Sequence, residues 1–153
     1  MCGGAVALTA VSCPHCGHGS AIARSGLSGG AISVALAGAL IAAASILPWE
    51  TLLGVGFNGF QVGNAGVFCL GIGLVVGLPG LTQIEGRGLG TGTRALAFLG
   101  GLAAVGLALL GFVQVHKQTL NSVIGSVGVG VFVVAIGGGL AIAAALLADW
   151  RSD

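Results

Sequence analysis

"SVGVGVFVVAIGGGLAIAAALL", residues 126–147, is a run of 22 residues without a single Asp, Glu, Lys, Arg or His. About 20 apolar residues are enough for an α-helix to cross the roughly 30 Å of hydrocarbon in a bilayer. Three other runs of the same character cover residues 28–47, 63–82 and 95–115. The sequence therefore predicts an all-α membrane protein whose domain of residues 28–147 is a four-transmembrane-helix bundle.

The composition agrees with a chain that lies mostly in lipid. Of the 153 residues, 56% are apolar and only 6% are charged, and the mean hydropathy is +1.09. A soluble domain carries about 25% charged residues, far more than this chain. Ionisable groups inside a bilayer usually mark ion paths or proton relays, and the four runs contain none, which argues against a pump. Because the net charge is only +1, we expect no nucleic-acid partner.

The five Lys and Arg residues predict how the chain crosses the membrane. If the N-terminus is cytoplasmic, four of them lie inside and one lies outside, as the positive-inside rule favours. The four are Arg24, Arg87, Arg94 and Arg151, and the fifth is Lys117. We therefore expect a multi-pass protein of the bacterial cytoplasmic membrane, with cytoplasmic tails at residues 1–27 and 148–153. Trp49 and Trp150 follow the first and last runs and are expected to lie at opposite interfaces.

Small residues recur along all four runs. Helices associate in lipid through close contact, which favours Gly and Ala where they meet. The repeated residues are Ala31, Ala35, Ala39 and Ala43 in the first run, Gly73 and Gly77 in the second, Gly100, Ala104 and Ala108 in the third, and Gly137, Ala141 and Ala145 in the fourth. The pattern predicts a tight bundle in the lipid bilayer, with smooth faces suited to a homo-oligomer or a larger membrane complex.

The segment between the first two runs, residues 51–62, has the pattern of a β-hairpin. Leu53, Val55 and Phe57 alternate with other residues and are followed by Asn58-Gly59. Asn-Gly between apolar segments is a strong signal for a two-residue turn, because both turn positions need a positive φ. We expect a small extracytoplasmic β-hairpin with its turn at Asn58-Gly59.

The segment "SCPHCGHGS", residues 12–20, gathers two thiols and two imidazoles. Cys13 and Cys16 have the spacing of a zinc knuckle, in which one turn presents both thiolates to a metal. Structural zinc sites have four ligands, and Cys2 and His18 can complete the set, with His15 in reserve. Two chains could also share their knuckles. Zinc is the one cofactor that the sequence indicates.

Two other interpretations of this segment stay open. Cys-Pro-His-Cys also occurs in strongly oxidising thiol oxidoreductases, but a tail of 27 residues has no room for their thioredoxin-like domain. In the reducing cytoplasm, moreover, such a pair more often binds metal than forms a disulfide. The remaining interpretation is a tail that binds nothing tightly. Cys69 lies inside the second run and is expected to be a small apolar residue against a neighbouring helix.

Several short motifs appear in a familiar order. They are the Cys-Pro-x-Cys-Gly knuckle, "LPW" at residues 47–49, a glycine-rich outer hairpin, a basic inner loop before the third run, and "SVGVG" at residues 126–130. This layout resembles the uncharacterised four-span membrane proteins common in actinobacteria that carry a zinc-ribbon-like N-terminal knuckle. The resemblance implies a membrane location and a four-helix fold, and it matches Cys13, Pro14, Cys16 and Gly17 to half of a zinc ribbon.

These features predict a non-enzymatic integral membrane protein without catalytic residues, acting as a scaffold, a partner-docking protein or an accessory subunit. The knuckle would bind metal and dock a partner. The alternative is a small transporter or channel for a metal or a neutral solute, with Asn64, Thr82 and Ser126 lining a narrow pore. A membrane thiol oxidoreductase ranks third, because the only cysteine beyond the tail is Cys69.

Overall fold

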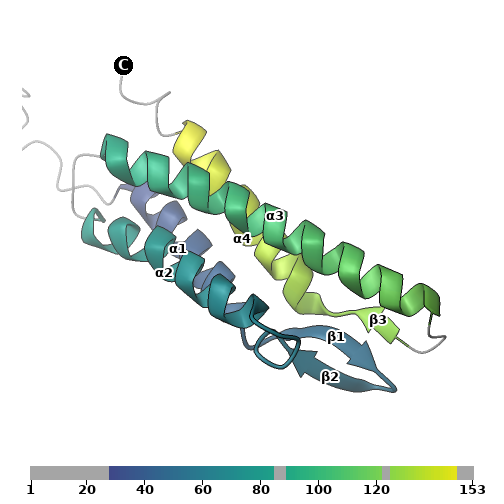
Figure 1. Ribbon diagram of the computed structural model, residues 1–153. Helices are drawn as coiled ribbons and strands as arrows, with labels where there is room; N and C mark the ends of the chain where they lie inside the picture. The colour runs from purple at the N-terminus through teal and green to yellow at the C-terminus, as the bar shows by residue number, and fades with distance from the viewer. Residues whose placement is uncertain (1–27, 85–88, 122–124, 148–153) are drawn as a thin grey trace, which may run out of the picture.

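The computed structural model of the chain describes residues 28–84, 89–121 and 125–147, of which 118–121 and 125 are described by their backbone alone. Four helices run back and forth and form a bundle (Figure 1). The helices are α1 Gly29–Ala43, α2 Ala65–Thr82, α3 Thr91–Asn121 and α4 Val129–Leu147. A small sheet lies at one end, called the sheet end below. The opposite end, where α1 begins and α4 ends, is called the far end.

Three of the helices are long and apolar enough to cross a membrane by length and composition. They are Ala65–Thr82, Thr91–Lys117 and Val129–Leu147. This finding confirms the prediction of a helical multi-pass membrane protein, while the orientation stays a prediction. The first predicted span, residues 28–47, is only partly confirmed, because α1 ends at Ala43. Its 15 residues measure about 22 Å, which is short of a full crossing.

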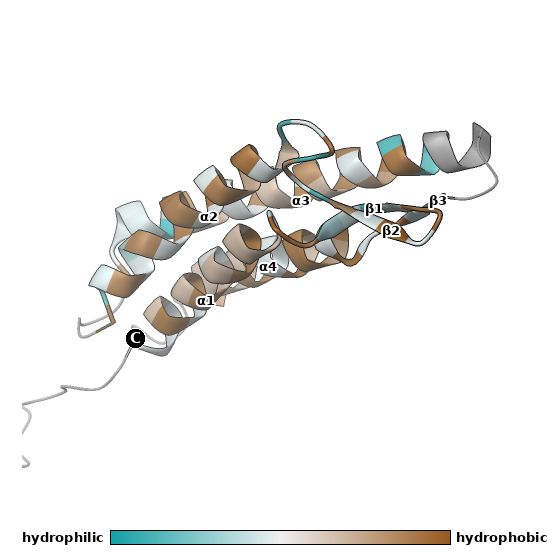
Figure 2. Cartoon of the chain, turned by 90° about the horizontal axis from the view of Figure 1, so that it is seen from below, coloured by the Kyte–Doolittle hydropathy of each residue, from teal (hydrophilic) through white to brown (hydrophobic). Residues whose placement is uncertain are grey.

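The perimeter of the bundle is covered by large apolar side chains. Leu74, Leu99, Leu109 and Ile136, one or two from each of α2, α3 and α4, are each about half or more exposed. Figure 2 shows apolar colouring along the lengths of the helices, with hydrophilic residues mainly towards their ends and in the loops. Contiguous apolar surface of this kind marks contact with a membrane or a partner. The exposed surface of the helices therefore suits contact with lipid.

Two pairs of helices approach each other until their backbones touch. Between α1 and α2, a Cβ added to Gly73 would lie 2.6 Å from the Ala42 nitrogen, and one added to Gly38 would overlap the Gly77 backbone. Between α3 and α4, a Cβ on Gly101 would lie 2.7 Å from the Gly138 oxygen. Such distances are shorter than a methyl group tolerates. Glycine is required at these crossings, as expected for helices that associate by close contact.

The predicted stripe on α1 is wrong in detail. Ala31 is buried, but Ala39 and Ala43 are exposed. A strict four-residue step advances about 40° further round the helix each time, since one turn holds 3.6 residues. The residues that α1 buries are spaced mostly three or four apart and so keep to one face: Ala31, Val34, Ala37, Gly38 and Ile41. The stripes on the other helices are confirmed, with Gly100 alone only partly buried.

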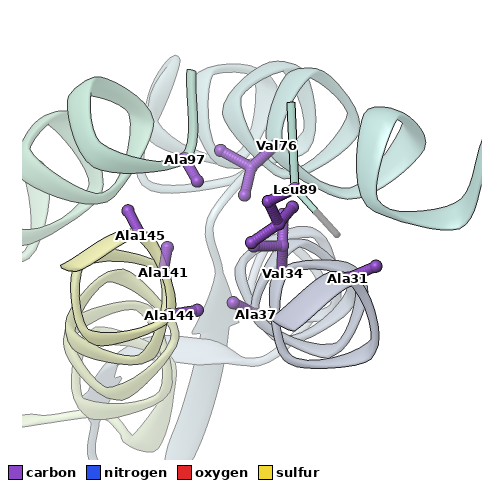
Figure 3. Close-up of a cluster of buried hydrophobic side chains, with 9 residues drawn as sticks. All are labelled: Ala31, Val34, Ala37, Val76, Leu89, Ala97, Ala141, Ala144 and Ala145. Atoms are coloured by element: carbon purple, nitrogen blue, oxygen red, sulfur yellow. The ribbon is translucent and has the colours of Figure 1, made fainter. Parts of the chain in front are cut away.

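The far half of the bundle has a core of mostly small side chains, drawn from all four helices and from Leu89 just before α3 (Figure 3). Its buried members are Ala31, Val34, Ala37, Val76, Leu89, Ala97, Ala141, Ala144 and Ala145. Alanine and valine predominate, which is how four helices can lie this close together. The core at the sheet end is different, because it contains Trp49.

The sheet consists of three antiparallel strands in the order β2-β1-β3. They are β1 Pro48–Leu52, β2 Val55–Asn58 and β3 Gly125–Val127. The hairpin between α1 and α2 is confirmed, but its predicted turn is wrong. The chain turns at Leu53 and Gly54, whose φ values of 53° and 80° are both positive, as this two-residue turn requires.

Asn58-Gly59 instead attaches the end of the hairpin to the helices. The Asn58 side-chain oxygen accepts hydrogen bonds from the backbone N–H groups of Phe60 and Gln61 at 3.2 and 3.0 Å. The Gly59 N–H donates to the Ser45 oxygen at 3.1 Å, just beyond α1. A Cβ on Gly59 would lie 3.0 Å from Gly66 Cα, so the loop rests directly on the first turn of α2.

The third strand was not predicted from the sequence. The sequence places residues 126 and 127 in the fourth span, but in the structure they pair with β1, Ser126 opposite Thr51 and Val127 opposite Glu50. The Thr51 hydroxyl is hydrogen-bonded to Ser126, to both its hydroxyl and its carbonyl oxygen. The fourth helix consequently begins at Val129, three residues later than predicted.

Candidate functional site

The predicted zinc ligands lie outside the described residues, so the knuckle stays a prediction. They are Cys2, Cys13, Cys16 and His18, with His15 in reserve. Within residues 28–84, 89–121 and 125–147, no group of three or more His, Cys, Asp or Glu side chains could hold a metal ion. Cys69 is a free thiol, fully buried in the core at the sheet end. The structure therefore places Cys69 as expected.

Trp49 organises the sheet end of the bundle. Its side chain is only 1% exposed, and its ring packs against glycines of α3 and α4. A Cβ on Gly111 would lie 3.0 Å from the ring, and one on Gly130 only 2.6 Å from it. The indole N–H donates to the Ala44 oxygen at 2.8 Å. The two glycines leave room for this ring inside the bundle, so it faces protein and not lipid, while its predicted level at the membrane interface stays a prediction.

The same hydrogen bond helps to end α1. The last carbonyls of a helix have no partner within it, and in lipid they need one. The Ala44 oxygen accepts from Trp49, and the Ala42 oxygen accepts from the Ser45 hydroxyl at 2.7 Å. The Ser45 carbonyl accepts from Gly59. The chain can therefore leave the helix early without unpaired groups at these positions.

A pocket of about 290 Å³ lies beside Trp49, between the beginning of α2 and the later part of α3. Its walls come from four parts of the chain: the hairpin, the segment that leads into α2, the first turn of α2, and about two turns of α3. The lining residues are Trp49, Val62, Asn64, Ala65, Phe68, Leu107, Leu110, Gly111, Gln114 and Val115. None of them is charged, and the two amides are the only polar side chains apart from the indole.

The pocket has a polar end and an apolar end. Because α2 and α3 run in opposite directions, the start of one lies beside the later part of the other (Figure 1). Asn64 and Gln114 therefore both lie towards the sheet end, while Phe68 and Leu107 both lie about one to two turns deeper. The Asn64 side chain makes no capping hydrogen bond to α2, so its amide is available to a ligand.

The pocket opens on the side of the bundle. Phe68 is 58% exposed and Leu110 is 64% exposed, although both line the pocket. In water, this opening would face solvent. In a membrane, Phe68 and Leu110 lie on helices that cross the hydrocarbon, so the pocket is accessible to lipid.

The polar residues predicted to line a narrow pore do not come together. Asn64 is at the sheet end of α2, whereas Thr82 ends the same helix about 27 Å away. The Thr82 hydroxyl donates to the Pro79 oxygen at 3.0 Å. Ser126 is hydrogen-bonded to Thr51 in the sheet. The three residues therefore lie in separate parts of the structure, and of the three only Asn64 lines the pocket.

Polar residues at the far end hold the helix ends together. The Gln83 amide donates to the Thr93 hydroxyl at 2.6 Å and accepts from the Gly90 N–H at 2.9 Å. The Ser28 N–H donates to the Ile84 oxygen at 3.0 Å. These bonds connect the start of α1 to the end of α2, and the end of α2 to the start of α3. Their role is structural, because they hold these helix ends in place.

Comparisons with protein-family models, with curated proteins and with solved structures found no match.

Sequence reasoning identified Asn64 but not the pocket. The missed residues are Trp49, which was expected at an interface, and Gln114. One signal was present, because Gln114 is the only amide in the apolar run of residues 95–115. A second was Gly111, a glycine on the same helix three residues before it. Neither signal indicates a pocket until Trp49 is known to lie between the helices.

Proposed function

We propose that this protein is a non-enzymatic scaffold or accessory subunit within the membrane. The observation that carries the proposal is the closure of two helix pairs, α1 with α2 and α3 with α4, by backbone contact at glycine. Such packing makes a rigid body with no space for a solute between those helices. Its large apolar perimeter is the surface on which another membrane protein or a second copy would pack.

The N-terminal tail would give this scaffold its cytoplasmic contact. Cys13 and Cys16, with Cys2 and His18, would hold one zinc ion and thereby fold the tail for a partner. The support for this part is the spacing of the cysteines and the positive-inside orientation, which brings the tail into a reducing compartment.

A transporter or channel is the second candidate, and the pocket is the observation that favours it. A path continuing from the pocket would have to pass Trp49, whose ring packs on Gly111 and Gly130. Transport therefore requires this ring to move away from α3 and α4. The scaffold requires no such movement, and for this reason we prefer it.

Flux measurements separate the two functions. The full chain is reconstituted into liposomes that contain a zinc-sensitive dye, and Zn²⁺ is added outside. A scaffold gives the same entry rate as protein-free liposomes, because the closed helix pairs leave no route. Saturable entry that depends on the protein would contradict the scaffold and favour transport. Glycerol entry, measured by light scattering, tests a neutral solute in the same way.

Zinc analysis of the purified full chain tests the knuckle. We expect stoichiometric zinc in the unmodified chain and its loss in Cys13→Ser and in Cys16→Ser, because each removes a thiolate ligand. Cys69→Ala is the matched control, since Cys69 is buried in α2 and should leave the zinc content unchanged. Metal-free unmodified protein, purified without chelators, would contradict the knuckle.

Native electrophoresis of solubilised membranes tests the docking role. The unmodified chain should migrate in a complex larger than the single chain, and Cys13→Ser should release it. A chain that migrates alone before and after this substitution would contradict a scaffold that works through its tail.

A further inference from the structure

We propose that the pocket beside Trp49 binds part of one acyl chain of a bilayer phospholipid, with the ester groups of that lipid beside Asn64 and Gln114. The inference goes beyond the scaffold function and does not depend on it. It follows from four properties of the pocket: its depth in the membrane, the order of its polar and apolar walls, its opening and its size.

The lengths of the helices place the pocket at the boundary between hydrocarbon and headgroups. Helix α2 has 18 residues and α4 has 19, about 27 and 28 Å, close to the thickness of the hydrocarbon. Asn64 directly precedes α2 and so lies at its boundary, with Phe68 one turn inside. Helix α3 has 31 residues, about 46 Å, so its last turns extend beyond the start of α2 (Figure 1).

The walls of the pocket follow the same order as the groups of a phospholipid. Ester carbonyls lie at the hydrocarbon boundary and accept hydrogen bonds, and the amide groups of Asn64 and Gln114 supply N–H donors at that level. The acyl chain begins immediately below, where the walls are Phe68 and Leu107. The absence of charge from the lining residues suits uncharged esters and methylene groups, because it supplies no partner for a buried ion.

The opening and the size indicate that only part of the lipid enters. The pocket of about 290 Å³ is at the low end of the range of about 300–1,000 Å³ for small-molecule sites. Its lateral opening at Phe68 and Leu110 lets the headgroup and the second acyl chain remain in the bilayer. A phospholipid can therefore enter from the membrane without first passing through water.

The fluorescence of Trp49 can report on the pocket, because this side chain lines the pocket and is otherwise buried in protein. The full chain carrying Trp150→Phe, which leaves Trp49 as its only tryptophan, is reconstituted in phosphatidylcholine vesicles. The lipid is then replaced by phosphatidylcholine brominated in the upper part of its acyl chains. Bromine quenches indole fluorescence at close range, so an acyl chain in the pocket should quench most of the Trp49 emission.

Two matched variants on α2 separate the pocket from ordinary lipid contact. Ala65→Phe fills the pocket and should lose most of the quenching, whereas Val67→Phe adds the same ring at a lipid-facing position outside it and should keep the quenching. Equal quenching in the two variants would overturn the proposal, since lipid around the bundle would then explain the signal. Unquenched emission in the Trp150→Phe chain would overturn it as well.

A third variant keeps the test decisive if Ala65→Phe fails to fold, as judged by circular dichroism. Asn64→Ala combined with Gln114→Ala leaves the apolar walls intact but removes the amide donors. We expect native mass spectrometry to show a retained phospholipid on the unmodified chain and on Val67→Phe, and its loss from the double variant. Retention in the double variant would overturn the role of the amides. Zinc flux and zinc content are separate measurements, so this proposal and the scaffold can fail independently.

Discussion

Helix α2 meets α1 and α3 in two different ways. Against α1, it brings Gly73, Gly77 and Gly80 so close that their backbones touch the neighbouring helix. Against α3, at the sheet end, it leaves a pocket with Ala65 and Phe68 in the wall. The same helix therefore forms one contact that excludes every side chain and another that leaves space for a ligand.

The difference shows what small residues can and cannot achieve in a membrane. Lipid and protein side chains are equally apolar, so helices gain little from burying apolar surface and depend on close contact. Glycine permits that contact between α1 and α2. At the sheet end, Trp49 occupies the interior instead, and a large planar ring does not fill the space between α2 and α3. Rigidity comes from the first arrangement, and room for binding comes from the second.

Trp49→Ala should have the largest effect on stability, because the sheet end loses its largest side chain and α1 loses the hydrogen bond to the Ala44 oxygen. We expect the free energy of unfolding to fall by about 4 kcal/mol, as for other buried aromatic residues. Steric trapping in bicelles measures this quantity. Trp49→Phe keeps most of the ring but leaves the Ala44 oxygen without its donor, so it should cost less. If Trp49→Ala leaves the free energy of unfolding unchanged, this ring does not organise the sheet end.

Gly38→Ala should break the close contact between α1 and α2. Its new methyl group would overlap the Gly77 backbone, which cannot give way as a flexible side chain can. We expect a loss of about 3 kcal/mol in the free energy of unfolding, the upper part of the usual range for overpacking. The matched control is Gly71→Ala on α2, where a Cβ meets nothing within 4 Å. Equal effects of the two substitutions would contradict the backbone contact.

Replacing alanine by leucine at two positions tests directly how the packed core differs from the pocket. Ala37→Leu adds three carbons to a fully buried position in the far core and should cost about 2 kcal/mol. Ala65→Leu adds the same atoms at the pocket and should change the free energy of unfolding by less than about 0.5 kcal/mol, because free space is present there. A large cost at Ala65 would mean that the pocket is closed in the membrane.

Thr51→Val should cause the smallest measurable loss of stability. It removes the hydroxyl that is hydrogen-bonded to Ser126 and so weakens the connection between β1 and β3. We expect a loss of about 0.5–1 kcal/mol, the net contribution of an exposed or partly exposed hydrogen bond. Hydrogen exchange should become faster in β1 and β3 and remain unchanged in α1 and α2. Faster exchange throughout the bundle would show that the sheet stabilises more than its own end.

The sequence predicts the helices well because their signal is long and simple. Runs of about 20 residues without charge cannot leave the backbone unpaired in lipid, so they form helices wherever they pack. The first run is the exception, since a hydrogen bond from Trp49, a residue outside the helix, helps to end it. That bond depends on Gly111 and Gly130, more than 60 residues away along the chain.

The hairpin and the pocket show where local patterns fail. Asn-Gly is the stronger turn signal, but Gly59 is needed where the loop rests on Gly66, and the chain turns at Leu53-Gly54 instead. A pocket depends on how far two helices stand apart, which no run of residues encodes by itself. Asn64 and Gln114 were visible as isolated amides, and only the antiparallel arrangement of α2 and α3 brings them into the lining of one pocket.

The early end of α1 has a further consequence, because a helix of about 22 Å creates a hydrophobic mismatch with a bilayer of about 30 Å. The segment that follows α1, up to and including the hairpin, carries exposed apolar side chains at Ile46, Leu52, Leu53 and Val55. We expect these side chains to make up the missing thickness, so that acyl tails on this side of the protein meet a strand where they would elsewhere meet a helix. A change in bilayer thickness should then alter the surroundings of the hairpin before those of the longer helices. Vesicles made from lipids of different tail length offer a direct way to change this thickness.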